Sequence, residues 1–184
     1  MSTRVSSDYD KDLNESKFAD FWTDYLSDYG QIQVSHDDFL IEAPLDVQID
    51  LKTKNLSWKR IENDRLNPGM IHVNHFGINR HFTKLCPICN KRHRALILAF
   101  FFADTYEKWF CAQVTPEWVT RPKHQMASYN DVDEKSSRQA VIYVGLSELT
   151  PLLSWFIDAR ERLTIEYALL EAERMRKRAS KPVY

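Results

Sequence analysis

The sequence contains no acidic residue between Asp64 and Asp104, and this interval carries a Cys-Pro-Ile-Cys pair formed by Cys86 and Cys89. The same interval holds six lysines and arginines and four of the six histidines. Two cysteines separated by two residues can present two thiolates to one metal ion at tetrahedral angles. A chain that uses the pair in this way must bring two further ligands to it, which constrains how residues 72–93 can fold.

Histidines of this interval supply candidates for the two further zinc ligands. His75 lies upstream in a segment with strand-like alternation, and His81 and His93 flank the cysteine pair at close spacing. His93 stands among three basic residues, whose charges repel a cation. The predicted zinc ligands are His75, His81, Cys86 and Cys89, with His93 as the alternative to His81.

Two other interpretations of the cysteine pair stay open. Redox pairs use the same spacing, but they begin a helix in a thioredoxin-like unit, and the four glycines and β-rich surroundings do not indicate one. The two thiols could also be ordinary buried cysteines. The third cysteine, Cys111, lies between Phe110 and Ala112 in a strand-like segment, so we expect a packed core thiol, with a ligand role as the alternative.

Charge is distributed unevenly along the chain. Residues 1–64 hold 7 basic and 14 acidic residues, whereas residues 104–184 hold 12 of each, and the total net charge is −1. This balance argues against a protein that coats nucleic acid by bulk charge, but the acid-free interval predicts a local basic groove with salt-dependent affinity.

The chain is predicted to form a single α+β domain with appendages. Residues 1–30 form an acidic segment with a short amphipathic helix at 16–29, and residues 31–147 form a β-rich core. Within that core we expect the zinc knuckle at 72–93 and a mobile loop at 121–139, which is polar and aperiodic. Strands are expected at 39–41, 47–52, 56–61, 70–76, 95–102, 108–115 and 140–144.

A long helix is predicted within residues 148–184. Thr150 is a suitable N-cap, Pro151 suits the first helical position, and apolar residues keep a spacing of three and four to about Arg178. The basic end of this helix could contact phosphates or another subunit, so a homo-oligomer through the helix is one expectation. A solvated helix end whose cations suit the helix dipole is the other.

Aromatic residues near the basic interval are candidates for stacking on bases. Trp58, Phe76, Phe82, Tyr106, Trp109 and Trp118 are considered, and Phe82 and Trp58 are preferred because basic or polar residues flank them. The predicted nucleic-acid-binding residues are Trp58, Lys59, Arg60, Arg80, Phe82, Lys84, Lys91, Arg92 and Arg94.

The run from Ile71 to His75 and the cysteine pair resembles the zinc-bearing part of the single-stranded DNA-binding, helix-destabilising proteins of T-even phages and related phage OB-fold proteins. The resemblance covers about twenty residues. It implies an OB-like barrel, a structural zinc bound by His75, Cys86 and Cys89, and a phage or mobile-element type of protein. The chain lacks the family's additional cysteine and its acidic C-terminal tail.

Two functional hypotheses follow. The first is a non-enzymatic protein that binds single-stranded DNA, or RNA, in DNA replication. The second is a zinc-containing interaction module that docks on a larger replication, transcription or defence complex. The sequence has no phosphate-binding glycine loop and no hydrolase or metalloprotease motif, so we expect no catalysis. A polar N-terminus and apolar runs too short to span a bilayer predict a cytoplasmic protein, in the host cell if viral, with no membrane partner.

Overall fold

The computed structural model describes residues 26–27, 32–35, 38–42, 45–74, 95–130 and 135–180. Within these ranges the chain forms two β-sheets, three helices, one 3-10 turn and a two-residue helical fragment at 26–27. The α+β class predicted from the sequence is confirmed. Among the helices in this part of the chain, none combines the length and the apolar character that a membrane crossing requires.

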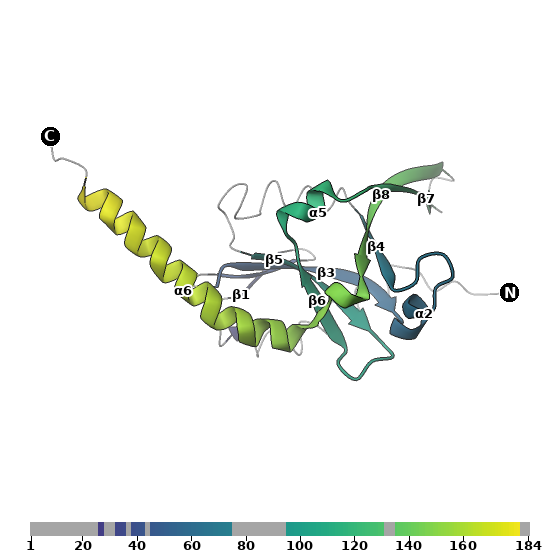
Figure 1. The fold of residues 1–184 in the computed structure, drawn as a ribbon, viewed down its shortest axis with the longest axis horizontal. Coiled ribbons are helices and arrows are strands. Elements are labelled where there is room, and N and C mark those ends of the chain that lie inside the picture. The colour runs from purple at the N-terminus through teal and green to yellow at the C-terminus, as the bar shows by residue number, and fades with distance from the viewer. Residues whose placement is uncertain are drawn as a thin grey trace.

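The larger sheet has six strands and mixed orientation (Figure 1). Its order is β1 (Ile32–Ser35), β2 (Asp38–Ile41), β3 (Val47–Leu56), β5 (Ala95–Phe102), β6 (Trp109–Gln113) and β9 (Thr150–Pro151). Strands β3 and β5 are parallel, and all other neighbours are antiparallel.

The smaller sheet has three antiparallel strands, with β8 (Lys135–Gly145) between β4 (Met70–Asn74) and β7 (His124–Asn130). Short helices connect the two sheets: α2 (Trp58–Glu62) precedes β4, and α5 (Pro116–Thr120) precedes β7. The 3-10 turn η1 (Leu146–Glu148) leads from β8 to β9. The chain therefore crosses between the sheets several times.

Strand β5 separates two hydrophobic clusters. Ala95, Ile97 and Ala99 belong to the first cluster, whereas the alternate residues of the strand belong to the second. The first cluster lies between the larger sheet and the last helix, and the second lies between the two sheets. Because β5 is buried on both faces, it is a continuous apolar run, as is usual for strands covered on both sides.

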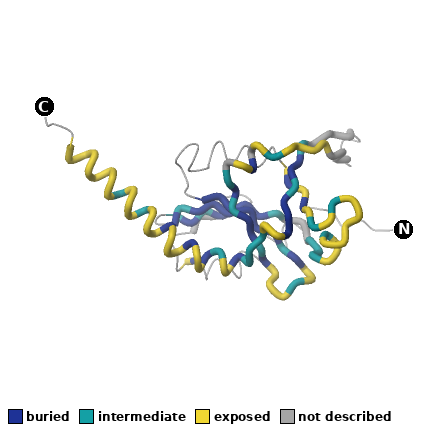
Figure 2. Tube along the Cα trace, in the orientation of Figure 1, coloured by how far each residue is buried: buried dark blue, intermediate teal, exposed yellow. Residues whose placement is uncertain are grey.

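The last helix, α6 (Leu152–Ala179), is anchored by its first half only. Leu152, Phe156, Ala159 and Leu163 are fully or almost fully buried in the first cluster, at the spacing of one helix face. After Leu163 the helix continues for about 24 Å at 1.5 Å per residue. This second half projects from the body of the molecule and is exposed on almost every side (Figure 2).

Several expectations from the sequence need correction. The described strands form two open sheets rather than a closed OB-like barrel, because the two edge strands of the larger sheet do not pair with each other and the smaller sheet is separate. The strand expected at 56–61 is instead the end of β3 followed by α2. Trp58 and Ile61, three residues apart, both pack on the second cluster, which is a helical spacing.

The prediction of a loop at 121–139 is also wrong, since most of these residues form the hairpin of β7 and β8. Backbone pairing holds these strands, and only from Ile142 does β8 contribute side chains to the second cluster. Thr150 does not cap α6. Thr150 lies in β9, where it pairs with Cys111 of β6, and the helix begins at Leu152.

Candidate nucleic-acid interface

Helix α2 carries three of the predicted nucleic-acid-binding residues, and a carboxylate from a distant part of the chain holds its N-terminus. Asp104, in the turn after β5, accepts hydrogen bonds from the Ser57 hydroxyl (2.8 Å) and from the backbone N–H groups of Trp58 (2.7 Å) and Lys59 (3.1 Å). Desolvation raises the pKa of Asp104, but these hydrogen bonds together lower it to about 2. The donors at this helix end are therefore already satisfied by the chain itself.

The Trp58 ring packs on the core. Its centroid lies 5.1 Å from that of Phe102 and 5.0 Å from that of Phe110, and the side chain is half-buried. Trp58 thus holds α2 against the larger sheet, and its stacking role stays a prediction. Lys59 and Arg60 are exposed on the same helix, where they are available to a phosphate.

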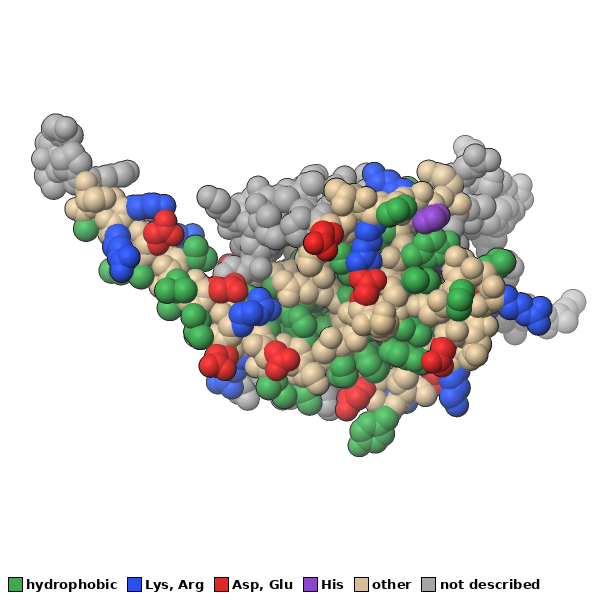
Figure 3. All heavy atoms as spheres, in the orientation of Figure 1, with side chains coloured by type: hydrophobic (Ala, Val, Ile, Leu, Met, Phe, Trp, Pro, Cys, Tyr) green, Lys and Arg blue, Asp and Glu red, His purple; other side chains and the backbone are tan. Residues whose placement is uncertain are grey.

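A row of three rings lies across the smaller sheet. His72 of β4 pairs directly with Tyr143 of β8, and their ring centroids are 4.7 Å apart. His124 of β7 lies on the other side, with its centroid 4.5 Å from that of Tyr143. Both imidazoles are exposed and Tyr143 is half-buried, so the row is open to solvent. Figure 3 shows a histidine among hydrophobic side chains on the face over β8.

The face of the row follows from strand geometry. His124 pairs with Val141, two residues along β8 from Tyr143. Alternate residues of a strand share one face, so the three rings lie together, and the residues between them point to the second cluster. The two imidazole planes are inclined by 63° and 62° to the Tyr143 ring, so the rings meet edge to face.

Asp64 holds the turn between α2 and β4. Asp64 accepts backbone hydrogen bonds from Asn67 (2.8 Å) and Leu66 (2.9 Å), which are the main cause of its lowered pKa. His72 and Arg60 lower the pKa of Asp64 further, by smaller amounts. Helix α2 contacts β4, the strand that carries His72.

Gly69 closes this turn at a φ of 70°, a left-handed conformation that glycine adopts without steric cost. Its N–H donates to the Ile61 carbonyl (2.8 Å), and its carbonyl accepts from the Leu146 N–H (2.8 Å). The turn thereby ties α2, β4 and η1 together. This fixes the position of the ring row relative to α2.

Arg121, just after α5, holds the backbone at the centre of the row. Its guanidinium donates to the Tyr143 carbonyl (3.1 Å), pairs with Glu148 and lies 4.5 Å above the Trp118 ring. Desolvation raises the pKa of Glu148, but the hydrogen bonds from Arg121 and from the Gly145 N–H outweigh it and lower the pKa. Arg121 is thus a positioning residue for Tyr143.

The remaining predicted site residues lie outside the described residues. These are the metal candidates His75, His81, Cys86, Cys89 and His93, and the binding candidates Arg80, Phe82, Lys84, Lys91, Arg92 and Arg94. These candidates lie between Asn74, which follows His72 by two residues, and Ala95, which begins β5 of the larger sheet. The interval that carries these candidates therefore begins next to the ring row.

Other predicted residues are placed clearly. Cys111 is fully buried, and burial raises the pKa of its thiol to about 12, so the expectation of a core thiol is confirmed. Trp109 and Trp118 are buried, whereas Tyr106 is 96 % exposed at the turn between β5 and β6. Within the described ranges, no group of three or more histidine, cysteine or acidic side chains is placed to hold a metal ion.

Tyr143, His124 and Arg121 were not predicted as site residues. Tyr143 is the polar exception between Ile142 and Val144, a pattern that indicates an outward-facing residue of a strand. Its two imidazole neighbours, however, come from β4 and β7, and no sequence pattern gives that strand order. The pairing could be read only from the fold.

No family model, no curated protein and no solved structure matches this chain. The chemistry open to the site therefore follows from its own residues. An exposed row of aromatic rings can stack on planar bases, and nearby cations can contact a phosphate backbone.

Proposed function

We propose that this protein binds single-stranded nucleic acid, with bases stacked on the His72–Tyr143–His124 row and phosphates held by exposed cations. The observation that supports it most is the position of this row at the start of the acid-free basic interval. Lys59 and Arg60 supply cations on one side of the row. The basic residues between Asp64 and Asp104 supply the rest of the charge.

Single strands suit this surface better than a duplex does. Bases of a single strand are free to stack on protein rings, whereas those of a duplex are stacked on one another. Stacking on a protein ring contributes about 1–3 kcal/mol per base. Each phosphate contact on a single strand adds about 0.7 to the slope of log affinity against log salt.

Zinc belongs to the same proposal, and its support is the sequence spacing. Cys86 and Cys89 with His75 and His81, or His93 in place of His81, form a ligand set that suits Zn²⁺. A zinc held there would have a structural role and would shape the basic interval. The resemblance to the phage single-stranded DNA-binding proteins supports this arrangement, a phage or mobile-element origin and action in the host cytoplasm.

The test is fluorescence anisotropy with labelled oligothymidylate and a labelled duplex, each at two salt concentrations. The variant is Tyr143→Ala, and the matched control is Tyr106→Ala, which removes an exposed ring that the structure places in the turn between β5 and β6 of the larger sheet, outside the row. We expect roughly a tenfold or greater loss for Tyr143→Ala and wild-type affinity for Tyr106→Ala. Tyr143→Phe keeps the ring and should bind as the wild type does.

A second readout tests the cations. The double variant Lys59→Ala and Arg60→Ala should reduce the salt slope by about 1.4 if both residues contact phosphates. The proposal would be overturned by an equal loss of affinity in Tyr143→Ala and Tyr106→Ala, by an affinity that does not depend on salt, or by equal binding of duplex and single strand. Circular dichroism of every variant checks that the fold is intact.

A further inference from the structure

We propose that two copies of this chain associate by antiparallel pairing of the projecting half of α6. Leu163 is the last residue of the helix buried against the body, and the helix continues to Ala179. The projecting half carries large apolar residues that the body does not cover. They include Ile165 (53 % exposed), Leu169 (67 %) and Met175 (69 %).

One face of this half has the spacing of a helix-pairing seam. Its residues alternate at intervals of four and three, which keeps them on one side of the helix. The seam consists of Glu161, Ile165, Ala168, Ala172, Met175 and Ala179, all exposed. It lies on the side opposite the buried residues Leu152 and Leu163, as expected from 100° of rotation per residue.

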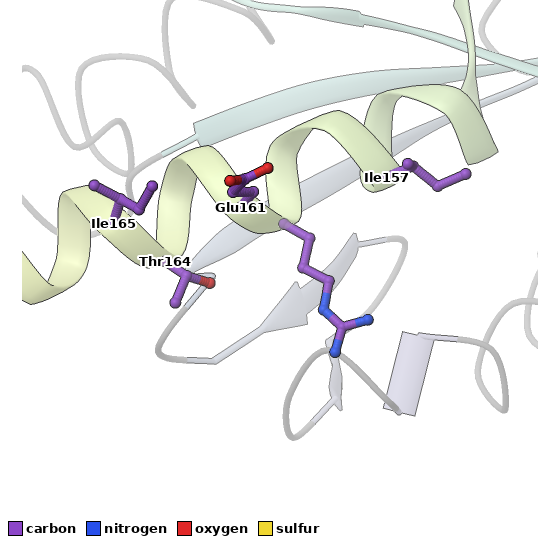
Figure 4. Close-up of a pocket in the computed structure, with 5 residues that line it drawn as sticks. Ile157, Glu161, Thr164 and Ile165 are labelled. Carbon is purple, nitrogen blue, oxygen red and sulfur yellow. The ribbon is translucent and has the colours of Figure 1, made fainter.

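A shallow, open hollow lies beside the N-terminal end of the seam. Ile157, Glu161, Thr164 and Ile165 lie along one side of the helix (Figure 4), and with Arg160 they line a hollow of about 500 Å³. In an antiparallel pair centred between Ala168 and Leu169, Met175 of the second copy comes opposite Arg162, at the edge of this hollow. The unbranched thioether side chain can adapt to such an irregular space.

The charge at the C-terminal end of the helix opposes a parallel pair. Residues 158–173 hold five acidic and two basic side chains, whereas residues 174–178 hold four basic and no acidic ones. In the antiparallel pair centred between Ala168 and Leu169, residues 174–178 of one copy lie opposite residues 159–163 of the other, and Arg176 comes opposite Glu161. A parallel pair would place the two basic ends together, and such like-charge contacts oppose that orientation.

The area of the contact indicates its strength. Residues 158–179 span about 33 Å, and half the surface of a cylinder about 10 Å across and this long is roughly 500 Å². Two copies would bury roughly 1,000 Å², which is at the lower end for specific interfaces. We therefore expect a reversible dimer with a Kd roughly in the micromolar range.

Sedimentation velocity of the full chain without nucleic acid, over a series of protein concentrations, tests the association. The wild type should shift from monomer to dimer as its concentration rises. Ile165→Lys places a charge in the seam and should leave a monomer. Leu170→Lys makes the same kind of change on the other side of the helix and should leave the dimer unchanged.

Charge reversal tests the orientation. Glu161→Arg and Arg176→Glu should each weaken the dimer, and the variant with both changes should restore it, because these residues meet only in an antiparallel pair. A monomer at every concentration, or a dimer insensitive to Ile165→Lys, would overturn the proposal. Failure of the double variant to restore the dimer would overturn the antiparallel arrangement.

Discussion

Replacing Leu163 by alanine tests how the long helix is fixed to the body. Leu163 is fully buried and is the last of four anchors in the first cluster. The substitution removes about three carbon atoms, or roughly 2.4 kcal/mol of transfer free energy at about 0.8 kcal/mol each. The cavity left behind adds to this, so the expected loss in the free energy of unfolding is about 2.5–4 kcal/mol.

Leu170→Ala is the matched control. Leu170 lies two turns further on the same side of α6, beyond the body, and is 45 % exposed. Its truncation leaves no cavity, so we expect a loss below about 1 kcal/mol. The contrast between the two leucines isolates the end of the contact between helix and body.

Urea unfolding followed by tryptophan fluorescence measures both variants, since Trp109 and Trp155 belong to or pack on the first cluster. With a slope of about 2 kcal/mol per molar urea, Leu163→Ala should lower the midpoint by roughly 1.2–2 M. Measurements at two protein concentrations separate this effect from self-association. Equal and small shifts for the two leucine variants would refute the packing of α6 at Leu163.

Two further predictions concern the capping carboxylate and the cysteine pair. Because hydrogen bonds lower the pKa of Asp104 from 3.8 to about 2, the stability that its carboxylate contributes should be complete above about pH 4 and lost as the pH falls towards 2. The difference in thermal stability between the wild type and Asp104→Asn should therefore shrink over this range. A difference that stays constant would contradict the capping role. Elemental analysis should find about one zinc per chain, lost in Cys86→Ser and Cys89→Ser and kept in Cys111→Ala, whereas retention of zinc in the first two variants would exclude them as ligands.

The sequence predicted best those elements whose buried residues follow a regular spacing within one segment of the chain. Strand β5 matches its predicted bounds because every second residue meets one cluster and the others meet the opposite one. The body-facing part of α6 was predicted from the spacing of Phe156 and Leu163, since a single sheet covers that face.

Elements that depend on distant partners were missed. The short helix after β3 looks like a strand locally, and its start is fixed by Asp104, more than forty residues away. The same applies to the ring row, because Tyr143 acquires His72 and His124 only through the strand order of the smaller sheet. Lys59 and Arg60 were predicted as surface cations from their local sequence, and the structure places both at the surface.

The side chains on the two faces of β5 differ in size as well as in the cluster that they contact. Ala95, Ile97 and Ala99 belong to the first cluster, and Phe101 packs against it, while the second cluster contains Leu96, Leu98, Phe100 and Phe102. A shift of the strand by one residue would exchange these sets, leaving voids on one side and clashes on the other. The sequence of β5 therefore specifies the register of this strand in the sheet. Insertions and deletions within β5 should therefore destabilise the fold, because they would exchange the side chains that meet the two clusters.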